Sequence, residues 1–310
     1  MIKLVFPILF LLANIAVAAE VPKSPYIAIV YPYAEAMIKA DRAKYPLGQN
    51  DLRLFYTLSE LSGRPNYKIA ADAQVKLLLQ NPAGMTERSR PWMLWDRCFE
   101  INPDQARALV EKSSSIRAFA AAYQHTKDEK FLKLVESAMV PAKSPTEQIA
   151  IAIDAWGVAA RVPEPLATKL RRFAESQDEA VLAGPNPSQN LAMLCVSRYE
   201  NTGNVRYRDL VHAAADGYNK NPPSDPQLSP MTFGHIISLQ LAAWRSTSRQ
   251  EYLDSARKFA DMAVKTFWTG DSPIPQITQG ADSLVLSLLE LHLSILHITA
   301  VRCPPNTIDR

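Results

Sequence analysis

Apolar residues recur along this chain with a period close to 3.6 residues, and no stretch alternates convincingly with a period of two. This pattern predicts helices and no sheet, so the expected fold class is all-α. With boundaries good to a few residues only, the expected helical spans are 26–42, 51–62, 65–80, 90–101, 103–125, 128–140, 146–160, 163–183, 188–202, 204–219, 231–247, 249–268 and 281–300.

A short pattern recurs between these spans. A Ser or Thr ends an apolar helix, and an aromatic residue five positions later opens the next one. We interpret each copy as a helical hairpin with a tight turn, in which the aromatic side chain packs against the preceding helix. The predicted role of these aromatics is therefore core packing. The pairs are Ser62 with Tyr67, Thr126 with Phe131, Thr202 with Tyr207, and Thr247 with Tyr252.

The N-terminal segment has the order of residues that is typical of an export signal. Lys3 supplies a positive charge, an apolar run follows, and small residues close the segment. Signal peptidase prefers small residues near its cleavage point, so we expect cleavage after Ala18 or Ala19. The apolar run is shorter than the roughly 20 residues that a membrane helix needs. The sequence therefore predicts a signal peptide over 1–19 and a single secreted or periplasmic helical domain over 20–310.

Composition narrows the classes of function. Hydrophobic residues make up 47% of the chain and charged residues 21%, which is typical of a soluble globular domain and argues against disorder. The net charge of +3 is spread without long basic runs, so neither nucleic acid nor an anionic membrane surface is an expected partner. Cys98, Cys195 and Cys303 have no metal-binding spacing. One pair could form a disulfide after export, or the cysteines could be small buried apolar residues.

Several phrases resemble bacterial secreted proteins of the six-hairpin glycosidase-like superfamily. They are NTGNVRYRDLVHAAADGY, STSRQEYLDSARKFADMAV, RPWMLWDRCFEINPDQAR and GADSLVLSLLELH. The resemblance extends from the region of Asn50 to that of His297. It implies an (α/α)6 toroid of about 12 helices, complete or partly open, related in architecture to pectate lyases and glycoside hydrolases. It also implies a polysaccharide or oligosaccharide ligand, bound at one end of the ring.

The densest group of side chains that could bind a sugar is Trp92, Trp95, Asp96 and Arg97. The first three have i, i+3 and i+4 spacing and would share one face of a helix. A Trp side chain can stack on a sugar ring, Asp96 can act as an acid or base, and Arg97 can pair with a uronate carboxylate. The alternative is a Trp pair packed inside the toroid beside an Asp96–Arg97 helix–helix salt bridge.

Two further candidates lie in apolar helices. Asp154 stands in the segment IAIAIDAWGVAA, where a carboxylate must be paired, solvated at a cleft or raised in pKa. It is the predicted general acid, with an inter-helix hydrogen bond as the alternative. His235 in MTFGHIISL is a candidate base or substrate-binding residue, or else a satisfied core histidine. Asp282 begins the last helix, where a carboxylate stabilises the helix dipole.

These candidates are compatible with two reactions. A hydrolase would use Asp96 and Asp154 as carboxylates roughly 5 to 10 Å apart, whereas a lyase would use Arg97 with His235. Because the connections between hairpins look short, a toroid that binds glycan or a protein partner without turnover is the alternative, as is a helical scaffold for protein partners. No metal is expected, since the sequence contains no HExxH motif, and no cofactor is expected, since it contains neither a P-loop nor a GxGxxG motif.

Overall fold

The computed structural model describes residues 24–40, 47–80, 101–110, 115–182, 189–224, 229–268 and 280–296. These residues form thirteen α-helices and no strand, so the all-α prediction is confirmed over these ranges. None of these helices has the length and apolarity needed to cross a membrane. The helices are α1 (Ile27–Lys39), α2 (Gln49–Ser62), α3 (Pro65–Gln80), α5 (Pro103–Val110), α6 (Ile116–Thr126), α7 (Lys130–Ser137), α8 (Pro145–Ala159), α9 (Leu166–Leu182), α10 (Gln189–Thr202), α11 (Val205–Lys220), α12 (Pro230–Thr247), α13 (Gln250–Phe267) and α14 (Ala281–Ile295).

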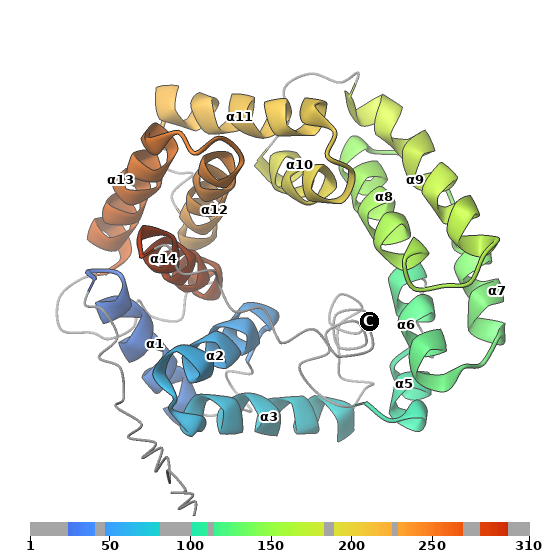
Figure 1. Cartoon of the computed structure of the whole chain (residues 1–310). Helices are drawn as coiled ribbons and strands as arrows, with labels where there is room; N and C mark the ends of the chain where they lie inside the picture. Colours follow the sequence, from blue (N-terminus) through green and yellow to red (C-terminus); the bar gives the residue numbers. More distant parts are fainter. Residues whose placement is uncertain are drawn as a thin grey trace, which may run out of the picture.

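The helices follow one another around a ring of two layers (Figure 1). The inner layer consists of α2, α6, α8, α10, α12 and α14, and the outer layer of α1, α3, α7, α9, α11 and α13. Each inner helix contacts the outer helix that follows it in the chain, except α14, which contacts α1 and so joins the two ends of the described chain. This pairing is consistent with the predicted six-hairpin toroid.

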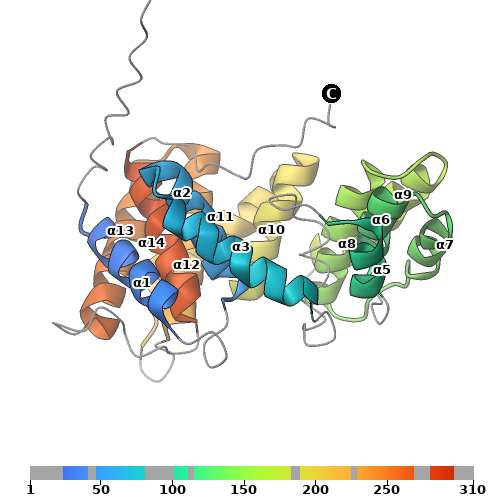
Figure 2. The ribbon, with the colours of Figure 1, turned by 90° about the horizontal axis from the view of Figure 1, so that it is seen from below.

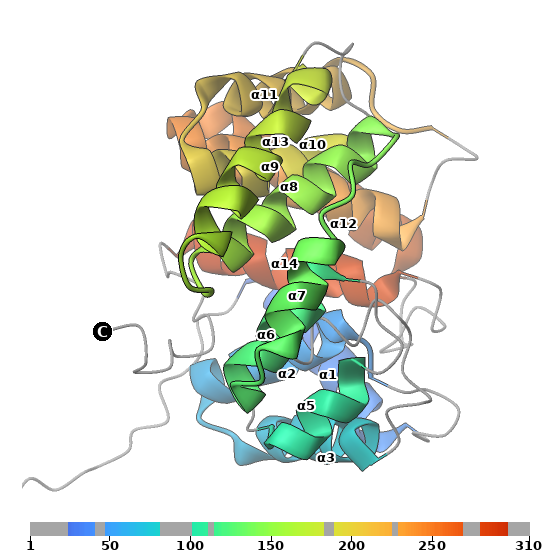
Figure 3. The ribbon, with the colours of Figure 1, turned by 90° about the vertical axis from the view of Figure 1, so that its right-hand side faces the viewer.

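Two further views show how the layers are stacked. Seen from below, the outer helix α3 crosses the front of the molecule, from the side of α1 and α2 toward that of α5 (Figure 2). In Figure 3 the outer helices α7 and α9 face the viewer. Neighbouring inner helices contact each other from α6 through α8, α10, α12 and α14 to α2. The inner layer therefore lines the ring from α6 round to α2.

The predicted hairpin turns share one hydrogen-bond pattern. The Ser or Thr hydroxyl donates to the carbonyl four residues earlier, at oxygen–oxygen distances of 2.6–2.8 Å, and accepts the amide N–H two residues later at 3.2 Å. The residue between them is left-handed, with φ of 57–66°, and its N–H also bonds a carbonyl of the last turn. The four left-handed residues are Gly63, Lys127, Gly203 and Ser248.

The aromatic residue that follows each turn is buried, as predicted. Tyr67, Phe131, Tyr207 and Tyr252 are at most 3% exposed. Each one stands in the first turn of an outer helix and packs in the core between the two layers. The interpretation of these aromatics as packing residues is therefore confirmed.

One predicted helix is wrong. The span 103–125 is not continuous, because α5 ends at Val110 and α6 begins at Ile116. Ser115 precedes α6 with an extended backbone, φ −84° and ψ 126°. Serine side chains compete with the helix for backbone hydrogen bonds, so a serine-rich segment favours a break over a continuous helix. The predicted helix 90–101 and the export signal lie outside the described residues.

Candidate functional site

The structure describes part of the predicted site. Asp154 lies on α8 and His235 on α12, and both helices belong to the inner layer with α10 between them (Figure 1). Both side chains are partly buried. Whether they converge with the remaining candidates stays a prediction, because those residues lie outside the described ranges. They are Trp92, Trp95, Asp96 and Arg97.

Asp154 stands apart from the buried face of α8, which includes Ala152 and Ala155. No hydrogen bond joins its carboxyl group to another described residue. Burial raises the pKa of Asp154 above its ordinary value, and the guanidinium of Arg117 on the neighbouring inner helix α6 opposes part of that rise. The predicted inter-helix hydrogen bond is therefore not found among the described residues, whereas the raised pKa agrees with the prediction from the apolar sequence around Asp154.

The first turns of α12 and α14 touch backbone to backbone. A Cβ added to Gly234 on α12 would lie 2.8 Å from the carbonyl carbon and oxygen of Ser283 on α14. The hydroxyl of Ser287 donates to the carbonyl oxygen of Gly234 at 2.8 Å, which fixes the same contact one turn further along. His235 directly follows Gly234, and Asp282 directly precedes Ser283. This contact between the two helices therefore brings the backbones at Asp282 and His235 into one neighbourhood.

A third inner helix joins this contact. The side-chain amide of Asn50, in the first turn of α2, donates to Oδ2 of Asp282 at 3.0 Å. Burial lowers the pKa of His235, and the carboxylate of Asp282 opposes that change. Asp282 begins α14, where its charge suits the helix dipole as predicted. Its bond to Asn50 and its effect on His235 were not predicted.

Asp51, the neighbour of Asn50, has a structural role. It is 4% exposed, and it accepts hydrogen bonds from the Tyr33 hydroxyl at 2.9 Å and from the Gly48 N–H at 3.0 Å. Gly48 is the N-cap of α2, so Asp51 completes a capping box and ties α1 to the first turn of α2. A polar residue three positions after a helix N-cap is a readable signal, but its partner on α1 is not.

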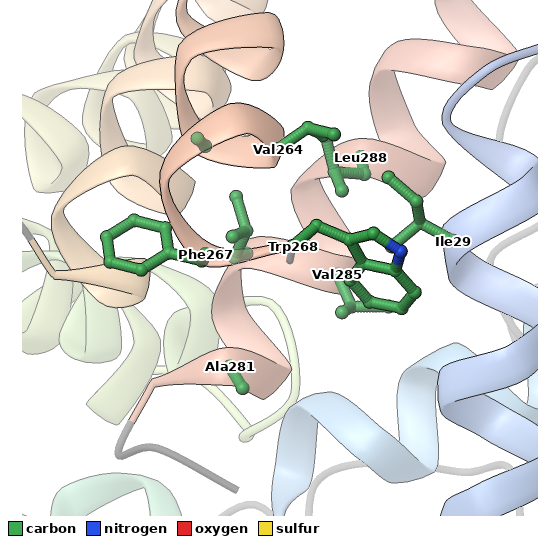
Figure 4. Close-up of a pocket in the computed structure, with 9 residues that line it drawn as sticks. Ile29, Val264, Phe267, Trp268, Ala281, Val285 and Leu288 are labelled. Atoms are coloured by element: carbon green, nitrogen blue, oxygen red, sulfur yellow. The ribbon is translucent and has the colours of Figure 1, made fainter. Parts of the chain in front are cut away.

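A small apolar cavity lies between α1, α13 and α14 (Figure 4). Its volume, counted as the space for the centre of a water-sized sphere, is about 10 Å³. Nearly all of its lining is aliphatic or aromatic carbon, so it cannot orient the hydroxyl groups of a sugar. We therefore assign it to packing. The lining residues are Ile29, Ala263, Val264, Phe267, Trp268, Ala281, Leu284, Val285 and Leu288.

Metal and thiol chemistry find little support in the described part of the chain. Within those residues, no group of three or more His, Cys, Asp or Glu side chains is placed to hold a metal ion. Cys195 is a buried free thiol, and burial raises its pKa to about 12, so it does not ionise near neutral pH. Cys98 and Cys303 lie outside the described residues.

No known protein family, no curated protein and no solved structure matches this chain. The relation to six-hairpin glycosidase-like proteins therefore stays a prediction from the sequence phrases.

Proposed function

We propose that this chain is an exported carbohydrate-active protein that cleaves a polymeric glycan bound against the inner layer of the ring. The observation that carries the proposal is the protonation and hydrogen bonding of the Asp154 carboxyl group. Burial favours its protonated form, and no described residue hydrogen-bonds it. By contrast, the structural carboxylate Asp178 accepts two hydrogen bonds from Arg198 and one from Tyr207. A carboxyl with a raised pKa and no structural partner is typical of a catalytic acid.

In the hydrolase form of the proposal, Asp154 donates its proton to the glycosidic oxygen as the bond to the sugar carbon breaks. A second carboxylate must then act as nucleophile or activate a water, roughly 5 to 10 Å away from the first depending on the stereochemical course. Asp96 is the sequence-predicted partner. Arg117 limits the rise in the pKa of Asp154, so the carboxyl group can still give up its proton to the glycosidic oxygen.

A lyase form is favoured by one separate observation. Because burial lowers the pKa of His235, its imidazole is neutral at pH 7 and can accept a proton. His235 would remove the proton from the carbon next to a uronate carboxylate. The electron pair left behind forms a carbon–carbon double bond, and the glycosidic carbon–oxygen bond breaks as the leaving oxygen takes up a proton. Arg97 is the sequence-predicted partner of the uronate carboxylate.

The two forms are separated by assaying the secreted protein on pectin-, alginate- and glucan-type polymers. New reducing ends report either reaction, whereas ultraviolet absorbance by an unsaturated sugar reports elimination only. We expect Asp154→Asn to abolish hydrolysis, or His235→Gln to abolish elimination. Asp104→Asn is the matched control, because the Asp104 side chain on α5 is 93% exposed. Glycan binding without turnover would support the non-catalytic alternative, and absence of binding would refute the proposal.

A stability measurement tests the role of Asp154 without any substrate. Because its pKa is raised in the folded state, the ionised carboxylate costs stability near pH 7, and that cost disappears as the pH falls. Asp154→Asn should therefore leave the free energy of unfolding unchanged or raise it. Asp178→Asn should lower the free energy of unfolding by about 3–5 kcal/mol, because it leaves the buried charge of Arg198 without an opposite charge. Equal losses in the two variants would make Asp154 a structural residue.

A further inference from the structure

The place where α2, α12 and α14 meet connects residues that are far apart in the sequence. Gly234 and Ser283 touch through their backbones, which leaves little freedom in the spacing of α12 and α14. Asn50 then fixes Asp282 from α2 through a hydrogen bond of 3.0 Å. His235 stands beside this contact on α12.

The helix that carries Asn50 is itself held in place. Asp51, the next residue along α2, is bonded by Tyr33 at 2.9 Å and by Gly48 at 3.0 Å. Both Tyr33 and Asp51 are buried. The side-chain amide of Asn50 therefore starts from a rigid turn, so its bond can orient one carboxylate oxygen of Asp282 and leave the other oxygen available.

We propose that Asp282, oriented by Asn50, is the positioning residue that holds the imidazole of His235 and balances its charge when it accepts a proton. The proposal rests on the lyase form of the proposed function. It adds two linked interactions: Asn50 on α2 orients Asp282 on α14, and Asp282 acts on the base His235 on α12. A carboxylate beside a catalytic histidine fixes the orientation of the ring and stabilises the imidazolium that forms.

Two other carboxylates, on α2 and α14, are already engaged in hydrogen bonds. Asp51 is held by Tyr33 and Gly48. Glu290, further along α14, accepts a hydrogen bond from Ser238, the residue three positions after His235 on α12. Asp282 is the charged group that acts on His235 from α14. Among these carboxylates, its removal should therefore have the largest effect on the titration of His235.

The test is an NMR pH titration of the histidine ring protons in the full mature protein, with His235→Gln used to assign the resonance. We expect Asp282→Asn to lower the pKa of His235, because the substitution removes the negative charge that favours the imidazolium. Asn50→Ala keeps that charge but frees the carboxylate, so it should shift the pKa less. The resonances of His212 and His292 serve as internal controls and should not move.

The outcomes separate this inference from the proposed function. An unchanged pKa of His235 in Asp282→Asn would overturn the inference, and Asp282→Ser provides a second uncharged variant if the first fails to fold. A lower pKa without turnover on any glycan would support the Asp282–His235 pair and count against the lyase. On a polymer that the protein cleaves, Asp282→Asn should lower kcat by up to about 100-fold and leave KM little changed. A factor of about 100 is the smaller end of what a general base contributes to the rate.

Discussion

The contact between α12 and α14 gives a sharp prediction, because it depends on one glycine. A methyl group at position 234 would lie 2.8–2.9 Å from backbone atoms of Ser283 and Leu284. Backbone atoms at a helix start cannot rotate away as the end of a flexible side chain can. Gly234→Ala must therefore push α14 away from α12. Gly217 on α11 is the matched control, because nothing lies within 4 Å of a Cβ added there.

The expected change in the free energy of unfolding is set by two opposing effects. Replacing Gly by Ala in a helix interior stabilises by roughly 0.5–1 kcal/mol at either position. At Gly217 that gain should appear alone. At Gly234 it is opposed by overpacking, which costs about 1–3 kcal/mol when a core cannot relax. Because the propensity term is common to both variants, the difference between their stabilities isolates the packing term, and we expect it to be about 1–3 kcal/mol.

Chemical denaturation followed by circular dichroism measures this difference directly. The comparison of Gly234→Ala with Gly217→Ala also carries information about the site. Because Gly234 adjoins His235, and Ser283 adjoins Asp282, moving the two helices apart should weaken the influence of Asp282 on the pKa of His235 as well. Equal stability of the two alanine variants would refute the backbone contact and, with it, the structural basis of the Asp282–His235 pair.

Three further predictions concern single residues. Thr202→Val removes a hydroxyl that bonds at 2.8 Å and 3.2 Å in the turn after α10, and should cost about 1 kcal/mol in urea denaturation. Cys195, with a buried thiol of pKa about 12, should react with a thiol reagent only as fast as the chain opens, so a rate independent of stability would contradict its burial. Burial also lowers the pKa of His292 in the folded chain below its ordinary 6.5. Near pH 6.5 the unfolded chain therefore binds more protons than the folded chain. The stability that is present above pH 6.5 is then lost as the pH falls. His292→Gln should flatten the acid limb of a stability–pH curve, with the residual slope due in part to His212 and His235, whose pKa values are lowered in the same direction.

The turns show which parts of the fold can be predicted from sequence. A Ser or Thr at a helix end, followed five positions later by an aromatic, is a local pattern, and the hydrogen bonds that it makes span at most four residues. Such short-range chemistry is readable without a structure. Helix boundaries were likewise predicted to within a few residues over most described ranges. The break at Ser115 was missed because apolar periodicity continues across it.

The site could be predicted only in part. A raised pKa was one of three states that the apolar sequence around Asp154 allowed, and it is the one found, since that effect depends mainly on burial. The sequence could not show that no described residue bonds Asp154, because a partner can come from any helix. Nor could it link Asn50 to Asp282, which are 232 residues apart in the chain. Contacts that cross the ring depend on the closure of the hairpins and leave no local pattern.

Two carboxyl groups on the described helices, those of Asp178 and Asp154, differ in their hydrogen bonds, and the difference supports the assignment of the site. Arg198 is fully buried, forms two hydrogen bonds with Asp178 at 2.9 Å and 2.7 Å, and lies 4.9 Å from the centre of the Trp156 ring. With Tyr207 bonded to the same carboxylate, this group joins α8, α9, α10 and α11. A buried ion pair offsets its desolvation cost only when its geometry is good and most of its bonding capacity is used, so such a group sets the relation between adjacent hairpins. No described residue hydrogen-bonds the carboxyl group of Asp154, although it stands on the same helix as Trp156. The polar residues that hold the hairpins together and the carboxyl that we assign to chemistry are thus distinguished by their hydrogen bonds, which only the folded ring reveals.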